Sequence, residues 1–148
     1  MKILISESQY KRLIETEEEQ KVLEIPDLRI FGKNREIAWN RLQKFLEKKG
    51  NPPYSIEGNL DLRDTPIESL GNLQSVGGNL DLGRTPIESL GNLTSVGGYL
   101  DLRDTPIESL GNLQSVGKGL YLRKTPLSKM YTREQIREMV NVGGRIFL

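Results

Sequence analysis

Carboxylates recur at a fixed interval in the middle of this chain. They form two series with a spacing of 20 residues: Asp61, Asp81 and Asp101, and Glu68, Glu88 and Glu108. Two carboxylates roughly 5–10 Å apart catalyse glycoside hydrolysis, and clustered carboxylates bind calcium. However, calcium-binding solenoids place Gly and Asp in nonapeptide turns that this sequence does not contain, and nothing in the sequence would separate the pKa values of equivalent carboxylates. We therefore expect no catalytic residue, no metal site and no cofactor.

The composition narrows the range of functions further. The sequence contains no His and no Cys, so it lacks the usual general base, the commonest metal ligand and any disulfide. It contains no run of 18 apolar residues that would span a membrane. The apolar stretch Met1–Ile5 is too short for a secretory signal. These features predict a soluble, cytoplasmic and non-enzymatic protein.

The carboxylates belong to a repeat of 20 residues. Three near-identical copies of GNLDLRDTPIESLGNLQSVG fill residues 58–117, and a degenerate fourth copy follows. A fixed period of this length is typical of a solenoid, in which each repeat forms one coil stacked on the previous coil. Leu60 and Leu62 have the two-residue period of a strand, which directs both inward and leaves Asp61 facing outward. The repeats therefore predict a parallel β-ladder with one short strand per coil.

The second half of each coil carries a different pattern. Over Ile67–Val76 the apolar residues are three apart, which predicts an irregular return path that turns a corner about every three residues. The pair Thr65-Pro66 is expected to form an extended bend, because proline fixes its own φ and disfavours a helical residue before it. Gly71 and the pair Gly77-Gly78 supply positions at which φ can be positive.

The apolar positions of the repeat resemble those of a known family. They follow the spacing LxxVxxxLxLxxTxIxxL: Leu73, Val76, Leu80, Leu82, Thr85, Ile87 and Leu90. This pattern resembles a leucine-rich repeat with Thr where many repeats carry Asn, and with one extra residue before the strand. The core SVGGxLxL is similar to the repeats of receptor L-domains and of short bacterial and phage-encoded proteins. The resemblance implies an α/β solenoid with a leucine-rich-repeat-like parallel β-ladder, which serves as a binding scaffold.

Residues 1–57 are predicted to form an N-terminal helical segment and solenoid cap. An apolar strand is expected at Lys2–Ile5, and a helix is expected from Glu7 to Gln20. Ser6 and Gln9 have the three-residue spacing of a capping box at the start of this helix.

A second helix is expected to begin after Asn34, which can cap it, and to end at Lys49 before the stop signal GNPP. One face of this helix collects apolar residues: Ile37, Ala38, Leu42, Phe45 and Leu46. Trp39 lies beside this stripe, and we interpret it as cap packing rather than as a platform for a ligand. The preceding segment, Val22–Phe31, is expected to be extended.

Residues 58–148 are predicted to form the solenoid, of which residues 132–148 form a helix-plus-strand C-terminal cap. Thr132 and Gln135 have capping-box spacing. The helix that they begin has one apolar face: Ile136, Met139 and Val140. The final residues NVGGRIFL then recover the SVGGxLxL pattern and predict a last strand. Five strands are therefore expected in register: around Leu60, Leu80, Leu100, Leu120 and Ile146.

The outward positions at which the coils differ are informative, because the coils are otherwise near copies. Tyr99 stands where other coils carry Asn, Tyr121 where they carry Asp, and Gly83 where they carry Arg. Tyr and Arg dominate binding hot spots, and Gly83 would leave a shallow gap, although drift after duplication would produce the same differences. The candidate partner-binding residues are Arg63, Asp81, Tyr99, Asp101, Arg103, Tyr121 and Arg123.

Stacking would align equivalent side chains in columns about 4.8 Å apart. Asp81 and Asp101 are expected to face solvent and to repel each other, so the change Asp101→Asn should be neutral or slightly stabilising. Another column alternates in sign and predicts weakly favourable ion pairs: Asp64, Arg84, Asp104 and Lys124.

The net charge of +1 conceals an uneven distribution. Residues 58–117 carry 3 basic and 8 acidic groups, whereas residues 118–148 carry 7 basic and 2 acidic groups. Oppositely charged ends of this kind favour head-to-tail self-association. A surface that only keeps the protein in solution would have the same distribution of charge.

Three functional hypotheses follow. The first is a protein-protein interaction module, encoded by a phage or a bacterium, that binds another protein through the outward strand residues. The second is a structural virion or assembly protein. The third is nucleic-acid binding, which the repulsion between acidic coils and phosphates disfavours, through the basic C-terminal residues: Lys118, Arg123, Lys124, Lys129, Arg133, Arg137 and Arg145.

Overall fold

The computed structural model describes residues 6–9 and 21–148 of the chain. The strand predicted at Lys2–Ile5 and most of the helix predicted over residues 7–20 lie outside the described residues. The predicted capping box is present: the backbone N–H of Gln9 donates to Oγ of Ser6 at 3.2 Å, and the backbone N–H of Ser6 donates to Oε1 of Gln9 at 2.8 Å.

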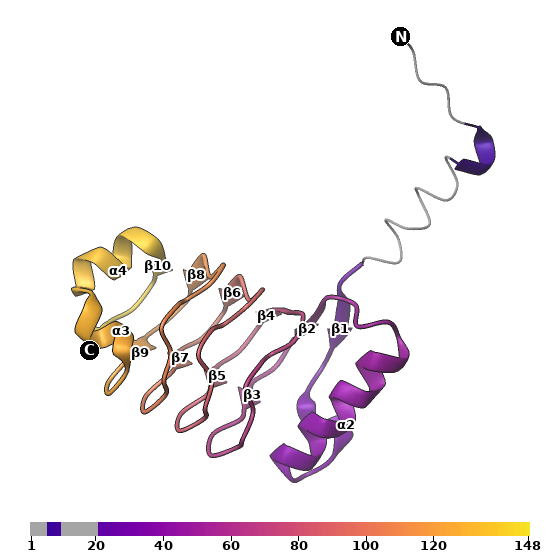
Figure 1. The fold of residues 1–148 in the computed structure, drawn as a ribbon, viewed down its shortest axis with the longest axis horizontal. Helices are drawn as coiled ribbons and strands as arrows, with labels where there is room; N and C mark the ends of the chain where they lie inside the picture. The colour runs from indigo at the N-terminus through magenta and orange to yellow at the C-terminus, as the bar shows by residue number, and fades with distance from the viewer. Residues whose placement is uncertain (1–5, 10–20) are drawn as a thin grey trace.

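Two parallel sheets run along a stack of coils (Figure 1). Within residues 21–148 the larger sheet has six strands in the order β1-β2-β4-β6-β8-β10, and the smaller has five in the order β11-β9-β7-β5-β3. The larger sheet comprises β1 (Leu23–Ile25), β2 (Tyr54–Ile56), β4 (Leu73–Val76), β6 (Ser95–Val96), β8 (Ser115–Val116) and β10 (Asn141–Val142). The smaller sheet comprises β3 (Leu60–Asp61), β5 (Leu80–Asp81), β7 (Leu100–Asp101), β9 (Leu120–Tyr121) and β11 (Ile146–Phe147).

The five-stranded sheet confirms the predicted parallel ladder. Its strands pair at the expected residues, in the register Leu60, Leu80, Leu100, Leu120 and Ile146. The six-stranded sheet lies on the return path, so the prediction of an irregular return path was wrong. The chain therefore forms a solenoid-like stack in which each coil from β2 onward contributes one strand to each sheet, and β1 adds a further strand to the larger sheet.

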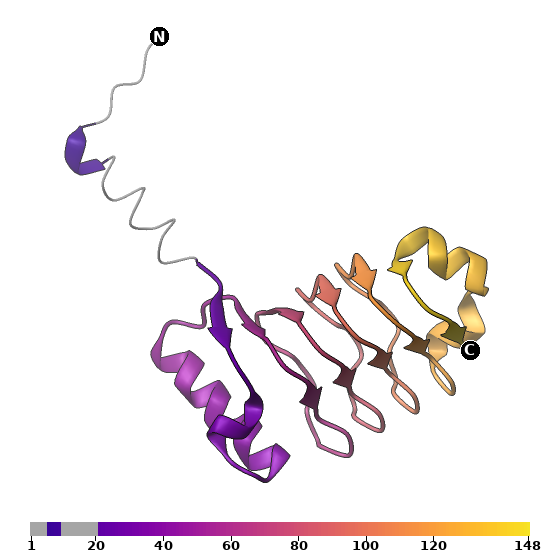
Figure 2. The same ribbon diagram turned by 180° about the vertical axis from the view of Figure 1, so that it is seen from behind.

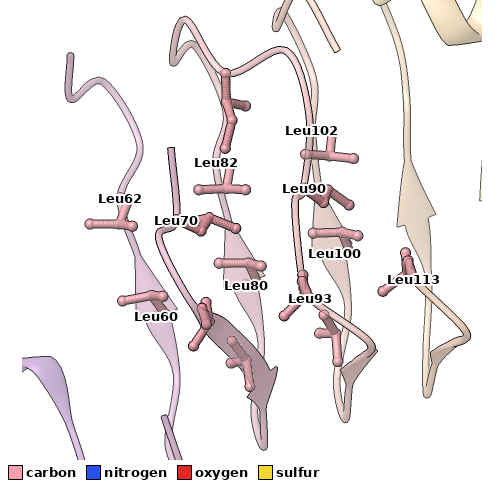
Figure 3. Close-up of a cluster of buried hydrophobic side chains, with 14 of the residues drawn as sticks. Leu60, Leu62, Leu70, Leu80, Leu82, Leu90, Leu93, Leu100, Leu102 and Leu113 are labelled. Atoms are coloured by element: carbon pink, nitrogen blue, oxygen red, sulfur yellow. The ribbon is translucent and has the colours of Figure 1, made fainter. Parts of the chain in front are cut away.

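The core lies between the two sheets. Equivalent leucines of successive coils stack above one another, as Leu80 and Leu100 do in Figure 3. Leu80, Leu82 and Leu100 have no exposed surface. Because each leucine row continues from one coil to the next, every coil covers the apolar face of its neighbour.

A tight turn follows each of the strands β3, β5, β7 and β9. One residue of each turn has a positive φ, between 57° and 59°: Asp64, Arg84, Asp104 and Lys124. This left-handed conformation costs a residue with a Cβ atom about 1–2 kcal/mol. The next residue closes the turn, because the buried hydroxyl of Thr65 donates to the carbonyl of Leu62 at 2.6 Å, and the later coils repeat this bond. The recurring Thr of the repeat therefore holds the corner of the coil.

Glycine serves two different purposes in the coil, a turn and a close approach between coils. Gly71 has a φ of 61°, as predicted for a turn glycine. Gly77 is not among the described residues with positive φ, so that part of the prediction was wrong. Glycine is needed in this column because the backbones of neighbouring coils approach closely there. A Cβ on Gly97 would clash with the backbone oxygen of Gly77 in the preceding coil.

The N-terminal end of the stack is covered by α2 (Arg35–Lys48), which follows the 3₁₀ helix η1 (Leu28–Phe31) (Figure 2). The side chain of Asn34 accepts the backbone N–H of Ile37 and caps α2, as predicted. Trp39 is buried and packs in the cap, also as predicted. Ile37 is 50% exposed, so its assignment to the buried face was wrong. Residues 28–31 form a 3₁₀ turn rather than the expected extended chain.

The C-terminal end is covered by α3 (Pro126–Met130) and α4 (Arg133–Met139). The predicted capping box of Thr132 and Gln135 is present, and Ile136 lies in the core. Met139 is 46% exposed, so its assignment to the apolar face was wrong. Helix α3 was not predicted. Across residues 6–9 and 21–148, no helix has the length and apolar character needed to cross a membrane.

Candidate functional site

The outward-facing residues of the five-stranded sheet, here called the strand face, contain most of the candidate residues. Strand register aligns one column along this face: Asp61, Asp81, Asp101, Tyr121 and Phe147. A second column contains the arginines two residues further on, and Tyr99 belongs to a third column two residues earlier. The regular register therefore brings together side chains that are 20 or more residues apart in the sequence.

Two coils share one arrangement of Asp and Arg. The guanidinium of Arg63 donates to Asp61 through Nε at 3.0 Å and Nη2 at 2.9 Å. Arg103 binds Asp101 in the same way, with Nε 2.9 Å from Oδ1. In both coils the backbone N–H of the arginine also donates to its Asp, at 3.2 and 3.0 Å. Each arginine is thereby fixed over the carboxylate of its own strand.

The predicted solvent exposure of Asp81 and Asp101 was wrong. Asp101 is 3% exposed and Asp81 is 7% exposed. A central strand of a sheet has neighbours on both sides, and here Arg63 forms an ion pair with Asp81 across the strands while Arg103 covers Asp101. Asp101 is therefore a buried hydrogen-bond acceptor, and the expectation that Asp101→Asn would be neutral no longer holds.

The second coil departs from this arrangement at Gly83. Asp81 accepts the backbone N–H of Gly83 at 3.0 Å, but Gly83 has no guanidinium to offer. The nearest cation is Arg63, whose Nε lies 3.3 Å from Oδ2 of Asp81 and also donates to Asp61. Gly83 is itself buried, so the shallow gap predicted there is closed.

The pKa values of this column follow from these contacts. Burial raises the pKa of Asp81, and the neighbouring carboxylates Asp101 and Asp61 raise it further, against the opposing effects of the Gly83 N–H and Arg63. Burial also raises the pKa of Asp61, but the hydrogen bonds from Arg63 and the charge of Arg35 outweigh it and leave that pKa lowered. Asp81 is thus the carboxylate of this pair with the weaker charge compensation.

Three aromatic rings form a row at the C-terminal end of the strand face. Tyr99 meets Tyr121 edge to face, with ring centroids 5.9 Å apart, and Tyr121 stacks on Phe147 at 4.6 Å. The guanidinium carbon of Arg103 lies 5.4 Å from the centroid of the Tyr121 ring, a cation–π distance. All three rings are half-buried, so each keeps an edge or face toward solvent.

Burial raises the pKa of Tyr99, and the carboxylates of Asp81 and Asp101 add to the effect. Its phenol therefore stays protonated at neutral pH and remains available as a hydrogen-bond donor. The predicted anchors Tyr99, Tyr121 and Arg103 do lie together. Arg123 does not join them: its side chain is exposed and forms no ion pair or hydrogen bond within residues 21–148.

Three residues in or next to the strand face were missed by sequence reasoning. Phe147 occupies the Asp column, which the alignment of NVGGRIFL with SVGGxLxL already implied. Gly119 makes room for an aromatic ring, because a Cβ there would lie 3.2 Å from the ring of Tyr121. Arg35, at the start of α2, donates to Asp61 at 3.2 Å and to the carbonyl of Arg63 at 3.2 Å. No sequence signal connects Arg35 to the repeat, since it belongs to the cap.

Two basic residues proposed for nucleic-acid contact have structural partners. Nε of Arg133 donates to the carbonyl of Ile146 at 2.8 Å. Arg137 donates to the carbonyls of Val142 at 3.0 Å and Gly144 at 2.8 Å. These carbonyls lie in or beside the last strands of the two sheets, so the arginines satisfy backbone groups at the end of the stack.

The column of alternating charge behaves as predicted. Nη2 of Arg84 lies 2.9 Å from Oδ2 of Asp64, and Nζ of Lys124 lies 3.8 Å from Asp104. Among the residues that the structure describes, no three carboxylates gather closely enough to hold a metal ion.

The fold and the strand face define a class of protein: a small repeat protein of stacked two-strand coils with an aromatic and ion-paired outer surface. Comparison of the chain with models of known protein families, with curated proteins and with solved structures finds no match. Function must therefore be argued from the strand face itself.

Proposed function

We propose that this protein is a non-enzymatic interaction module of the leucine-rich-repeat type, which binds another protein through the strand face. The observation that carries the proposal is the row of aromatic rings, Tyr99, Tyr121 and Phe147, bordered by Arg103. Aromatic residues and arginine contribute most of the binding energy in protein interfaces. All three rings are partly exposed.

The rigidity of this row supports the proposal. Tyr121 is held between two other rings, and Arg103 is fixed by its hydrogen bonds to Asp101. Side chains that are ordered before binding lose little conformational entropy when a partner arrives. The aromatic row also marks the positions at which the chain departs from its own repeat, since the other coils carry Asn or Asp there.

The cellular setting is part of the same proposal. A chain without Cys suits a reducing compartment, and we place the protein in the cytoplasm of a bacterium or of a phage-infected bacterial cell.

The test reverts the row to the repeat's own residues. The double change Tyr99→Asn and Tyr121→Asp should preserve the fold, because other coils carry these residues at the same positions. Immobilised wild-type and reverted proteins would be exposed to lysate of the native host, and bound proteins would be quantified by mass spectrometry. A specific partner should bind the reverted protein more weakly by about 2 kcal/mol or more, the threshold for a hot spot.

A matched control changes the opposite side of the coil. Glu68, Glu88 and Glu108 are exposed and equally regular in their spacing, so replacing all three by Lys should affect capture of the same partner much less. A reverted protein that still captures every partner at full strength would overturn the proposal and direct attention to the caps.

The other two hypotheses have weaker support. Arg133 and Arg137 are engaged by backbone carbonyls, which leaves fewer free basic groups for nucleic acid. The same bonds cover the backbone edge at the C-terminal end of the stack, where head-to-tail assembly would have to form. The capture experiment reads bound proteins only, so nucleic-acid binding would be tested by gel shift of the purified protein and self-association by its sedimentation velocity.

A further inference from the structure

The second coil has no arginine at the position from which the first and third coils each supply a guanidinium to their own Asp. In the first and third coils an arginine two residues after the Asp forms a two-pronged contact with the carboxylate. In the second coil that position is Gly83, and within residues 21–148 no N–H donates a hydrogen bond to Oδ2 of Asp81. The side chain of Asp81 is nonetheless only 10% exposed. The chain thus contains two coils in which the Asp has an arginine of its own, and one in which Asp81 shares Arg63 with Asp61, at 3.3 Å from its Oδ2.

A cavity lies beside Asp81. It has a volume of about 170 Å³, and its lining includes two acidic residues, one arginine, two asparagines and one tyrosine: Asp61, Asp81, Arg63, Asn59, Asn79 and Tyr99. The amide oxygen of Asn79 already accepts the backbone N–H of Tyr99 at 2.9 Å, so the wall is fixed in place. The cavity therefore offers acceptors and an aromatic surface around a buried carboxylate.

We propose that this cavity binds an arginine side chain of the protein partner, with its guanidinium on Asp81. This inference rests on the proposed function and specifies the chemistry of the partner. A guanidinium matches a carboxylate with two parallel hydrogen bonds, and the ring of Tyr99 provides a cation–π surface beside it. The occupant and the aromatic row would then belong to one continuous interface.

The charges around Asp81 favour a cation over any other occupant. Asp61 and Asp81 share the guanidinium of Arg63, and burial together with the flanking carboxylates Asp101 and Asp61 raises the pKa of Asp81. Arg63 is committed to Asp61 by two hydrogen bonds and reaches Asp81 only at 3.3 Å. We expect an arginine rather than a lysine, because the first and third coils both place a planar guanidinium on the Asp. A lysine ammonium is a point charge and cannot form the same two parallel hydrogen bonds.

The test uses a capped arginine, N-acetyl-arginine amide, as the probe. Titration into the full-length protein, followed by NMR, should give saturable shifts of the backbone amides of Asp81, Gly83 and Tyr99. N-acetyl-citrulline amide has nearly the same shape without the charge and should bind weakly or not at all. N-acetyl-lysine amide should bind less tightly than the arginine probe.

Two variants test the site from opposite directions. Asp81→Asn removes the charge but keeps an oxygen that can accept the Gly83 N–H. Gly83→Arg supplies the guanidinium in cis, and the fold can accept it, because a Cβ there would lie 3.2 Å from Oδ1 of Asp81 and no nearer than 3.7 Å to any other atom outside the adjoining residues. Each variant should weaken binding of the arginine probe by about tenfold or more, the effect of losing one charge-assisted pair.

The inference is overturned if the arginine probe produces no saturable shifts, if citrulline binds as tightly as arginine, or if either variant binds the arginine probe as well as the wild type does. Failure here is distinguishable from failure of the proposed function. A partner that is lost on reverting Tyr99 and Tyr121 but unaffected by Gly83→Arg would retain the strand face as the binding surface and exclude only the arginine site.

Discussion

Tyr121 and Phe147 stack face to face, with ring planes 9° apart and centroids 4.6 Å apart. The two residues belong to neighbouring strands of the five-stranded sheet and pair in register, although 26 residues separate them because the C-terminal helices intervene. Phe147 therefore extends the aromatic row to the last strand of the ladder. The row therefore spans three successive coils rather than the two that carry tyrosines.

Replacing Phe147 by Ala should weaken both stability and partner capture. Loss of an aromatic pair costs about 0.5–1.5 kcal/mol in addition to the lost burial, and the free energy of unfolding can be measured by urea denaturation. Phe31→Ala provides the control, because Phe31 forms a similar pair with Phe45 in the N-terminal cap, with centroids 5.7 Å apart. The control should lose comparable stability and keep full binding. Equal binding by the two variants would exclude Phe147 from the interface.

Asp101→Asn should destabilise the protein by about 1.5–3 kcal/mol, the range for hydrogen bonds that involve a charged group. Asp101 is buried, and its carboxylate accepts hydrogen bonds from both Nε and Nη2 of Arg103. An amide would offer one acceptor oxygen and place an NH₂ group against the guanidinium. Chemical denaturation at neutral pH would measure the loss.

The matched control for Asp101 is Asp104→Asn in the same coil. Asp104 is exposed and has a φ of 58°, a conformation that Asn tolerates as well as Asp does. This change should alter the free energy of unfolding by no more than a few tenths of a kcal/mol. Equal effects at the two positions would mean that the Asp101–Arg103 contact contributes nothing specific.

The five-stranded sheet could be predicted from the sequence because its signal is repeated. Leu60 and Leu62 alternate in every coil, and the constant period fixes the register between coils. The six-stranded sheet could not be predicted in this way, because the apolar residues of its segments, such as Leu73 and Val76, are three apart. This spacing lacks the two-residue alternation of a strand and indicates corners instead.

The sequence predicts which residues belong to the strand face, but it does not predict how far each of these side chains is exposed. Register alone placed Asp101 and Tyr121 in one column, as the structure confirms. The burial of Asp101 depends on the direction in which Arg103 folds back, and a sequence pattern does not contain side-chain directions. Arg35 was unpredictable for another reason: it reaches Asp61 from a cap whose sequence is unrelated to the repeat.

Asp81→Asn should stabilise the protein at neutral pH. The pKa of Asp81 is raised in the folded protein, so its ionised form is less favourable there than in the unfolded chain. The folded state therefore binds this proton more tightly, and stability falls as pH rises from the ordinary carboxyl pKa through the raised value. Comparing wild type and variant by denaturation across pH should show a gain at pH 7 that disappears once Asp81 is protonated in both states.

Asp61→Asn should have the opposite effect in the same column. Its pKa is lowered by Arg63 and Arg35 despite burial, so the carboxylate contributes stability above the ordinary carboxyl pKa, and that contribution is lost as pH falls through the lowered value. The variant should therefore be less stable than wild type at pH 7. If both changes shifted stability in the same direction at pH 7, the charge imbalance attributed to Gly83 would be wrong.

Replacing Arg137 by Ala should both destabilise the C-terminal cap and expose an edge. Its guanidinium donates to the carbonyls of Val142 and Gly144, and hydrogen bonds from a charged group contribute about 1.5–3 kcal/mol. The freed carbonyls lie beside β10, the last strand of the six-stranded sheet, where a strand of another copy could pair. Sedimentation velocity should therefore detect concentration-dependent self-association. Arg145→Ala removes an equal charge from an exposed residue of the same cap and should leave the protein monomeric to the same degree as wild type. A monodisperse Arg137→Ala protein with wild-type stability would show that these bonds neither hold the cap nor protect the edge.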